Sequence, residues 1–112
     1  MVDDAQQLFR VMADPLRLRI LHLLRRGELC VGDLVTVLDV PQPTASRHLA
    51  YLKRVGLISA KKNSYWTFYT LALARTPLRR KLLECLDVDT AGRARDAKRL
   101  AAVQRRGGCC PM

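Results

Sequence analysis

The stretch VGDLVTVLDVPQPTASRHLAYLKRVG, residues 31–56, decides the fold. Apolar residues recur at helical spacing over 31–38 and again from about 43 to 55, which predicts two helices. Asp39 and Pro41 interrupt the pattern between them, because proline cannot continue a helix. The stretch therefore predicts a short helix, a tight turn and a longer second helix.

A β-hairpin is expected immediately downstream. The runs LISAK (57–61) and YWTFYTL (65–71) are rich in β-formers, and they enclose a polar turn at 62–64. Lys61 and Lys62 give this hairpin a basic tip. Two helices and a tight turn followed by a two-stranded ribbon form the winged helix-turn-helix plan, in which the second helix enters the major groove. We therefore expect a mainly α fold with a β-hairpin wing (α+β).

Two further helices are expected before this stretch. Asp3 is placed to cap a first helix that runs to about Ala13. Asp14 followed by Pro15 is a strong start signal, because aspartate caps the free N–H groups and proline fits the first helical position. Gly27 is expected to end this second helix.

The C-terminal part is expected to be helical as well. Thr76 followed by Pro77 repeats the start signal. The apolar stripe of this helix comprises Leu78, Leu82, Leu83 and Leu86, and Cys85 is expected to pack in the core with it. A last helix is expected from about Thr90 to Arg106, with a shared face of Ala94, Ala97, Leu100 and Ala101. Residues 1–106 would then form one domain, and 107–112 a flexible tail that carries cysteines.

The amino-acid composition and the motifs restrict the classes of function that we expect for this chain. The 112 residues include 20 Lys and Arg against 10 Asp and Glu, for a net charge of +10, and nucleic acid is the usual partner of such a chain. The chain lacks a nucleophile–base motif, a P-loop and a dinucleotide fingerprint, so we do not expect an enzyme. Apolar runs are far shorter than the roughly 20 residues of a membrane span, and the first residues do not resemble a secretory signal. We therefore expect a cytoplasmic protein without a membrane partner.

The helix expected over 43–55 has one apolar face and one cationic face. Ala45, Leu49 and Leu52 lie on the first at about 100° per residue. The opposite face carries Thr44, Arg47, Tyr51 and Arg54, with Ser46 and His48 on its flanks. An isolated helix with such a face is commonly just solvated, but the helix-turn-helix context favours contact with DNA.

The segment from Asp14 to Leu73 resembles ArsR/SmtB-type transcriptional repressors, and most closely the arsenical-responsive branch. The resemblance rests on DPLRLRILHLL, GELCVGDL, PQPTASRHLAYLKRVGLI and SYWTFYTL. It implies a homodimeric repressor that binds double-stranded operator DNA and leaves it when a soft metal or metalloid ion binds. The first and C-terminal helices are expected to form the dimer interface. From the resemblance and the helix faces together, the expected DNA contacts are Gln42, Thr44, Ser46, Arg47, His48, Tyr51, Arg54, Lys61 and Lys62.

The metalloid motif departs from that of the family. The best-known branch has ELCVCDL, whereas this chain has ELCVGDL, with Gly32 in place of the second cysteine. Trivalent arsenic prefers three soft sulfur donors, so other thiols must complete a site. Cys109 and Cys110 are the candidates, and with Cys30 they form the expected ligand set. No cofactor is expected for the repressor itself; trivalent arsenic or antimony would be the inducer.

Three other interpretations stay open at this point. Cys30 and a tail cysteine could form a reversible disulfide in a redox or persulfide sensor. The same thiolates could bind cadmium, lead or copper. The chain could also be a basic structural nucleic-acid binder without an inducer. His22 is expected to be a partly buried structural residue, and without histidine partners for its carboxylates the last helix does not suggest a zinc site.

Overall fold

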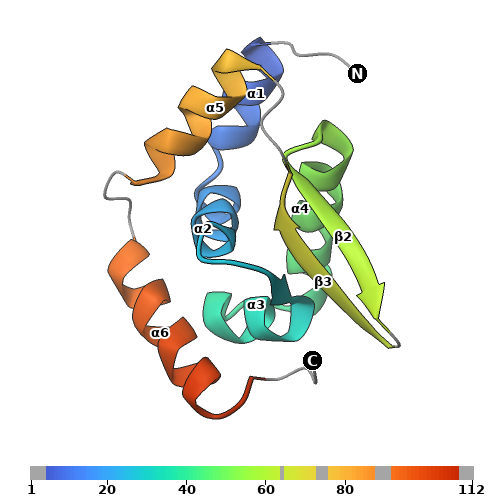
Figure 1. Cartoon of the computed structure of the whole chain (residues 1–112), viewed down its shortest axis with the longest axis vertical. Helices are drawn as coiled ribbons and strands as arrows, with labels where there is room; N and C mark the ends of the chain where they lie inside the picture. The colour runs from blue at the N-terminus through green and yellow to red at the C-terminus, as the bar shows by residue number, and fades with distance from the viewer. Residues whose placement is uncertain (1–4, 64, 73–75, 88–91, 109–112) are drawn as a thin grey trace.

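A computed structural model describes residues 5–63, 65–72, 76–87 and 92–108. Its elements in chain order are α1 (Ala5–Met12), α2 (Pro15–Leu24), β1 (Leu29–Cys30), α3 (Val31–Leu38), α4 (Gln42–Val55), β2 (Ile58–Asn63), β3 (Trp66–Leu71), α5 (Pro77–Glu84), a 3₁₀ turn (Cys85–Asp87) and α6 (Arg93–Arg105). In Figure 1 the hairpin of β2 and β3 lies along one side of the molecule and α6 along the other, with α2 and α3 between them. This arrangement is the expected winged helix-turn-helix fold.

Asp14 caps the N-terminus of α2, as predicted. The carboxylate of Asp14 accepts hydrogen bonds from the backbone N–H groups of Leu16 (2.8 Å) and Arg17 (3.1 Å). The helix ends at Leu24, somewhat before Gly27, whose φ of 135° suits glycine. The expected cap of the first helix, Asp3, lies outside the described residues.

The helix-turn-helix is also as predicted. Helix α3 spans the expected residues and ends at Asp39, which adopts a left-handed conformation with φ 56°. Helix α4 begins at Gln42, one residue before the proline that was expected to open it, and ends at Gly56 with φ 90°. The turn between the helices is therefore short, and the two helices pack against each other.

The sheet contains a strand that the sequence analysis missed. The hairpin of β2 and β3 is present as expected, but β1 adds a third antiparallel strand, in the order β1-β3-β2. Leu29 pairs with Tyr69, and Cys30 pairs with Phe68. A strand of two residues is too short to show the period-2 alternation that identifies strands. Its consequence is that Cys30 joins the wing to the start of α3.

The buried face of α6 shares only Leu100 with the face that was expected. The helix begins at Arg93 rather than near Thr90, and its buried residues are Asp96, Leu100 and Val103. Of the expected alanine face, Ala94 is exposed, and Ala97 and Ala101 are only half-buried. The difference arises because Asp96 pairs with Arg19 of α2, which turns this side of the helix inward.

Cys85 was expected in the core, and this expectation is wrong: its side chain is exposed. Helix α5 ends at Glu84, and Cys85 begins the 3₁₀ turn. A 3₁₀ turn has about 3.0 residues per turn, whereas an α-helix has 3.6. The side chains in the turn therefore point in other directions than they would in a continued α-helix. Leu86 is buried in this turn, together with Leu83 of α5.

Several arginines bind the carbonyl groups at helix C-termini. The buried Arg79 donates to the carbonyls of Gly56 (3.0 Å) and Val55 (2.9 Å) at the end of α4. Arg25 donates to the carbonyl of Leu83 near the end of α5 (3.0 Å), and Arg99 donates to the carbonyl of Val37 near the end of α3 (3.1 Å). Cations are favourable at these negative helix ends. Part of the positive charge that the composition assigned to a nucleic-acid partner thus stabilises the fold.

A buried ion pair holds α6 to α2. Arg19 donates from Nε to Oδ2 of Asp96 (2.8 Å) and from Nη2 to Oδ1 (2.9 Å), and Asp96 is 1% exposed. The same Nη2 donates to the carbonyl of Leu38 at the end of α3 (3.2 Å). The hydrogen bond to Asp96 raises the pKa of Arg19, which keeps its charge. One guanidinium therefore connects α2, α3 and α6.

None of the helices in the described part of the chain combines the length and the apolar character that crossing a bilayer requires.

The cap of α2 yields a pH-dependent prediction. Partial burial alone would raise the pKa of Asp14, but hydrogen bonds from the N–H groups of Arg17 and Leu16 and the charge of Arg17 hold it below 3.8. Asp14→Ala should lower the free energy of unfolding by about 1 kcal/mol at neutral pH, whereas Asp14→Asn should keep the cap. Urea denaturation at several pH values measures both variants.

The sign of the pH effect follows from the lowered pKa. The stability that the Asp14 charge adds over asparagine should be complete above the ordinary pKa of 3.8 and disappear as the pH falls through the lowered value. An advantage over Asp14→Asn that grows on acidification would contradict this account.

Breaking the buried pair should destabilise the chain. Asp96→Asn leaves the guanidinium of Arg19 without its charged partner, so we expect the free energy of unfolding to fall by about 2–4 kcal/mol. The exposed pair of Lys81 and Glu84, 3.7 Å apart, supplies a control. Glu84→Gln should change stability by less than about 0.5 kcal/mol. Similar losses in the two variants, measured by urea denaturation, would contradict the assignment.

Candidate nucleic-acid interface and thiol pocket

Helix α4 presents its cationic face outward, as expected. Ala45, Leu49, Leu52 and Val55 are buried against the core. Among the candidate DNA contacts on this helix, Gln42, Arg47 and Arg54 are exposed, and Thr44, Ser46, His48 and Tyr51 are half-buried. The packing of α4 on its apolar side thus leaves all seven candidates on or near the surface.

An arginine that the sequence analysis left out belongs to the same surface. Arg17 of α2 lies over the ring of Tyr51, with its Cζ 4.7 Å from the ring centroid, and Arg54 lies over it at 5.1 Å. A pocket of about 350 Å³ is lined by Arg17, Arg47, His48, Ala50, Tyr51 and Arg54. Arg17 is far from α4 in sequence, so no local pattern indicates that it belongs to this surface. The contact with Tyr51 is a product of the tertiary structure.

The wing carries the two expected lysines on strand β2. Lys61 and Lys62 are exposed and pair in register with Phe68 and Thr67 of β3. Tyr65, beside the tip, is 94% exposed. Its place beside Lys61 and Lys62 could have suggested a nucleic-acid contact from the sequence, because aromatic rings next to cations are common where proteins bind nucleic acids.

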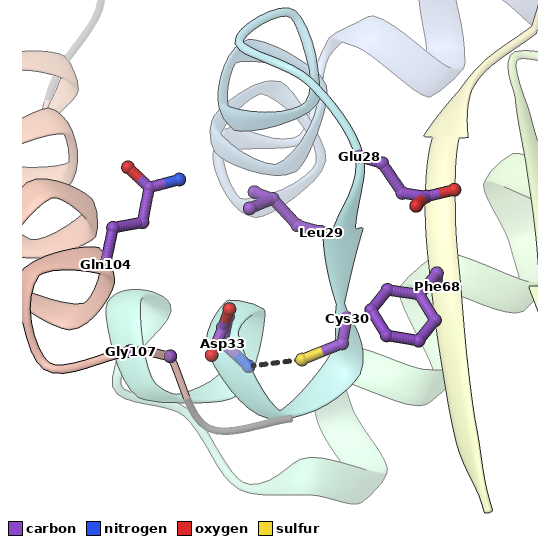
Figure 2. Close-up of a pocket in the computed structure, with 8 residues that line it drawn as sticks. Glu28, Leu29, Cys30, Asp33, Phe68, Gln104 and Gly107 are labelled. Carbon is purple, nitrogen blue, oxygen red and sulfur yellow. Dashed lines mark hydrogen bonds between the residues drawn. The ribbon is translucent and has the colours of Figure 1, made fainter. Parts of the chain in front are cut away.

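The Cys30 side chain lies at the N-terminus of α3. It is the N-cap residue, and its Sγ accepts a hydrogen bond from the backbone N–H of Asp33 (3.4 Å). Figure 2 shows Cys30 between Phe68 of β3 and Asp33 of α3. Cys30 is only 1% exposed. A helix N-terminus stabilises the thiolate form of a cysteine, which is the form that binds soft ions.

A pocket of about 230 Å³ adjoins this side chain. Its lining comprises Glu28, Leu29, Cys30, Asp33, Phe68, Gln104, Gly107 and Gly108. Gln104 and Gly107 lie across the pocket from Cys30 in Figure 2. The end of α6 and the residues that follow it therefore meet the start of α3, although about 75 residues of chain separate them.

Two glycines turn the chain onto α3 after α6. Gly107 and Gly108 have φ values of 89° and 79°, and Gly108 donates its N–H to the carbonyl of Val103 (2.9 Å). A Cβ atom on Gly108 would lie 3.2 Å from Oδ2 of Asp33. Both the left-handed backbone and this close approach favour glycine. Cys109 and Cys110, the other two predicted ligands, lie outside the described residues.

The described residues alone do not form a metal site. Among them, no three histidine, cysteine or acidic side chains cluster in a way that could hold a metal ion. His22, expected to be partly buried, is buried, and it accepts a hydrogen bond from Nε of Arg93. A site at Cys30 therefore needs donors from outside the described part of the chain.

Comparison with known proteins gives consistent matches. Residues 14–60 match the profile described as "Bacterial regulatory protein, arsR family". The chain is similar to the arsenical resistance operon repressor of Escherichia coli K12, with 51% identity over 59% of this chain and 57% of that protein. The chain thus spans little more than half the length of this relative.

Solved structures agree with this match. HlyU from Vibrio cholerae N16961 is 38% identical, with a TM-score of 0.62 over 70% of this chain and 83% of that chain. The AntR antimony-specific transcriptional repressor is 32% identical, with a TM-score of 0.59 over 70% and 68%. AntR is named as a transcriptional repressor, and HlyU of Vibrio cholerae is described as a transcriptional activator.

The N-cap role of Cys30 can be separated from any ligand role. In the presence of a thiol reductant, Cys30→Ser should leave the free energy of unfolding nearly unchanged, because serine oxygen is a preferred N-cap acceptor for the N–H of Asp33. Cys30→Ala removes the acceptor and should lower it by about 1 kcal/mol. Equal losses in the two variants, measured by thermal or urea denaturation, would contradict the capping role.

Proposed function

The chain belongs to the arsR family of bacterial regulatory proteins, and on this premise we propose that it is a homodimeric repressor that leaves operator DNA when trivalent arsenic or antimony binds its cysteine thiolates. The observation that carries this proposal is the approach of Gly107 and Gly108 to Cys30. It brings the segment just before Cys109 and Cys110 to the N-terminus of α3.

The DNA-binding half of the proposal rests on α4 and the wing. The exposed Arg47 and Arg54 of α4 and the exposed Lys61 and Lys62 of β2 supply cations for one groove and its flanking phosphates. The predicted contacts of Gln42, Thr44, Ser46, His48 and Tyr51 belong to the same face. Residues in the N-terminal half of α4 would contact base edges, and the arginines and lysines would contact phosphates.

We propose a dimer through α1 and α5. Phe9 of α1 is 57% exposed, and Leu78 and Leu82 of α5 are only half-buried, so apolar surface remains for a second copy. In Figure 1 both helices lie at the end of the molecule away from the hairpin tip. The large apolar residues of α6, Leu100 and Val103, are already buried within the chain and the others are alanines, so α6 offers little apolar surface to this interface. Two copies related by a twofold axis would fit a palindromic operator.

The proposed inducer site uses three sulfur donors of one chain. Consecutive Cα atoms are about 3.8 Å apart, so Cys109 and Cys110, one and two residues after Gly108, are within covalent reach of the pocket at Cys30. The carboxylates of Glu28 and Asp33 beside the pocket are hard ligands, whereas thiolates select soft ions. Three thiolates match the donor set that trivalent arsenic and antimony prefer.

Binding at this site would act on the DNA-binding elements through Cys30. This residue caps α3, the first helix of the helix-turn-helix, and pairs through β1 with Phe68 of the wing. A metalloid that ties the tail to Cys30 would shift α3 and the wing relative to each other. An energetic coupling of about 3 kcal/mol between inducer and operator would weaken DNA binding more than a hundredfold.

A thiol redox sensor is the second candidate, and the same approach of the tail to Cys30 favours it. Cys30 with Cys109 or Cys110 would then form a reversible disulfide, with the two electrons passing to an oxidant such as a peroxide. This candidate differs from the first in its inducer, not in its residues.

The test is fluorescence anisotropy of the reduced protein on its own upstream DNA. Arsenite, antimonite, cadmium and a mild oxidant are titrated in parallel against the wild type, Cys30→Ser and a chain that ends at Gly108. We expect arsenite or antimonite to release the wild type from DNA and to leave both variants bound. Cys30→Ser should still bind DNA in the absence of an inducer, since serine preserves the cap of α3.

Cys85→Ser is the matched control, because Cys85 is an exposed thiol outside the pocket. This variant should respond like the wild type. Release by oxidant alone would support the redox candidate instead. DNA binding that none of the four reagents changes would contradict both candidates.

A further inference from the structure

We propose that the pocket between α2 and α4 is a seat for one backbone phosphate of DNA, and that Arg17 is a phosphate contact from outside the recognition helix. The proposal rests on the proposed function, and it names the chemical group that this part of the surface binds. It concerns the pocket lined by Arg17, Arg47, His48, Tyr51 and Arg54.

Cationic groups converge in this pocket without an acidic residue among those that line it. Three guanidinium groups and one imidazole border a space of about 350 Å³. Asp14 acts electrostatically on Arg17 and His48, but its carboxylate already accepts the N–H groups of Leu16 and Arg17 as a helix cap. Like charges gathered at one place repel each other unless an anion lies between them. The pocket thus has the charge of an anion site.

The guanidinium of Arg17 is held in place before any ligand binds. Its Nε donates to the carbonyl of Val11 (2.9 Å) and its Nη2 to that of Arg10 (3.2 Å), both near the end of α1. Its Cζ lies over the ring of Tyr51, as does that of Arg54. Such cation–π contacts order long side chains that would otherwise be mobile. Tyr51 therefore acts as a positioning residue for two arginines.

Donor groups remain after these contacts. A guanidinium has five N–H groups, and Arg17 directs two of them to protein acceptors in the described part of the chain. Arg54 has no hydrogen-bond acceptor among the described residues, and its side chain is exposed. Planar N–H donors from two arginines match the oxygens of a phosphate group.

A phosphate in this seat would fix the register of α4 on the duplex without reading sequence. Phosphate contacts position a protein on DNA, whereas contacts with base edges specify the site. The contribution of this phosphate contact to DNA affinity should therefore be the same on an operator and on an unrelated duplex. Because Arg17 also binds the end of α1, the phosphate site connects the proposed dimer helix with the recognition helix.

The experiment measures DNA affinity as a function of salt concentration. Wild type, Arg17→Met and Arg54→Met are titrated by anisotropy on the upstream DNA and on a random duplex, from about 50 to 200 mM salt. We expect each variant to bind both duplexes about tenfold more weakly, and the slope of log K against log [salt] to fall by about 1. Arg54→Met keeps the test valid if Arg17→Met loosens α1, because Arg54 holds no helix end.

Arg105→Met is the matched control, since it removes one exposed charge at the end of α6. Its slope should equal that of the wild type. Tyr51→Leu should reproduce part of the loss, whereas Tyr51→Phe, which keeps the ring, should not. Folding of every variant is checked by circular dichroism.

Two results would overturn the proposal while leaving the proposed function intact. One is DNA binding with an unchanged salt slope in both arginine variants. The other is that inorganic phosphate alone saturates the pocket, seen as shifts of the NMR resonances of the Arg17 and Arg54 side chains, while the variants keep the wild-type slope of log K against log [salt] for DNA binding. Failure of the wild type to bind either duplex would instead overturn the proposed function itself.

Discussion

The ion pair between Arg19 and Asp96 is the interaction on which the thiol pocket depends. Helix α6 is largely polar and contributes only Leu100 and Val103 to the core, so apolar burial alone would fix its position weakly. The bidentate pair, with the further bond from Arg19 to the end of α3, fixes the helix across α2 and α3. Only with α6 in this position do Gly107 and Gly108 reach the pocket at Cys30. A charge inside the protein thereby determines which distant residues become neighbours.

Arginine has two roles in this protein. Arg25, Arg79 and Arg99 donate to carbonyl groups at or near helix ends, where they complete hydrogen bonds that the helices cannot make internally. Arg47 and Arg54 remain on the surface of α4. Arg17 combines the roles, because it binds carbonyls near the end of α1 and also lies over Tyr51. Net charge therefore indicated a polyanionic partner but could not indicate which cations face it.

Cys30 is the junction between the proposed sensor and the DNA-binding elements. Its backbone belongs to β1, its sulfur caps α3, and its side chain borders the pocket that the end of α6 completes. A ligand at this atom would act directly on the helix-turn-helix and on the wing strand. Because Gly32 stands where the family motif has its second cysteine, Cys30 is the sole cysteine in α3 and its cap, and further sulfur donors would have to come from the C-terminal residues.

The sequence by itself determined the helix starts at Asp14-Pro15 and Thr76-Pro77, the helix-turn-helix, the hairpin and the placement of Cys30. Each depends on groups within a few residues of one another, so a local pattern contains the whole signal. Tertiary structure decided the strand β1, the inward face of α6 and the contact of Arg17 with Tyr51. These depend on partners far away in the chain, and no local pattern identifies the residue across a sheet or the carboxylate that a buried arginine will meet.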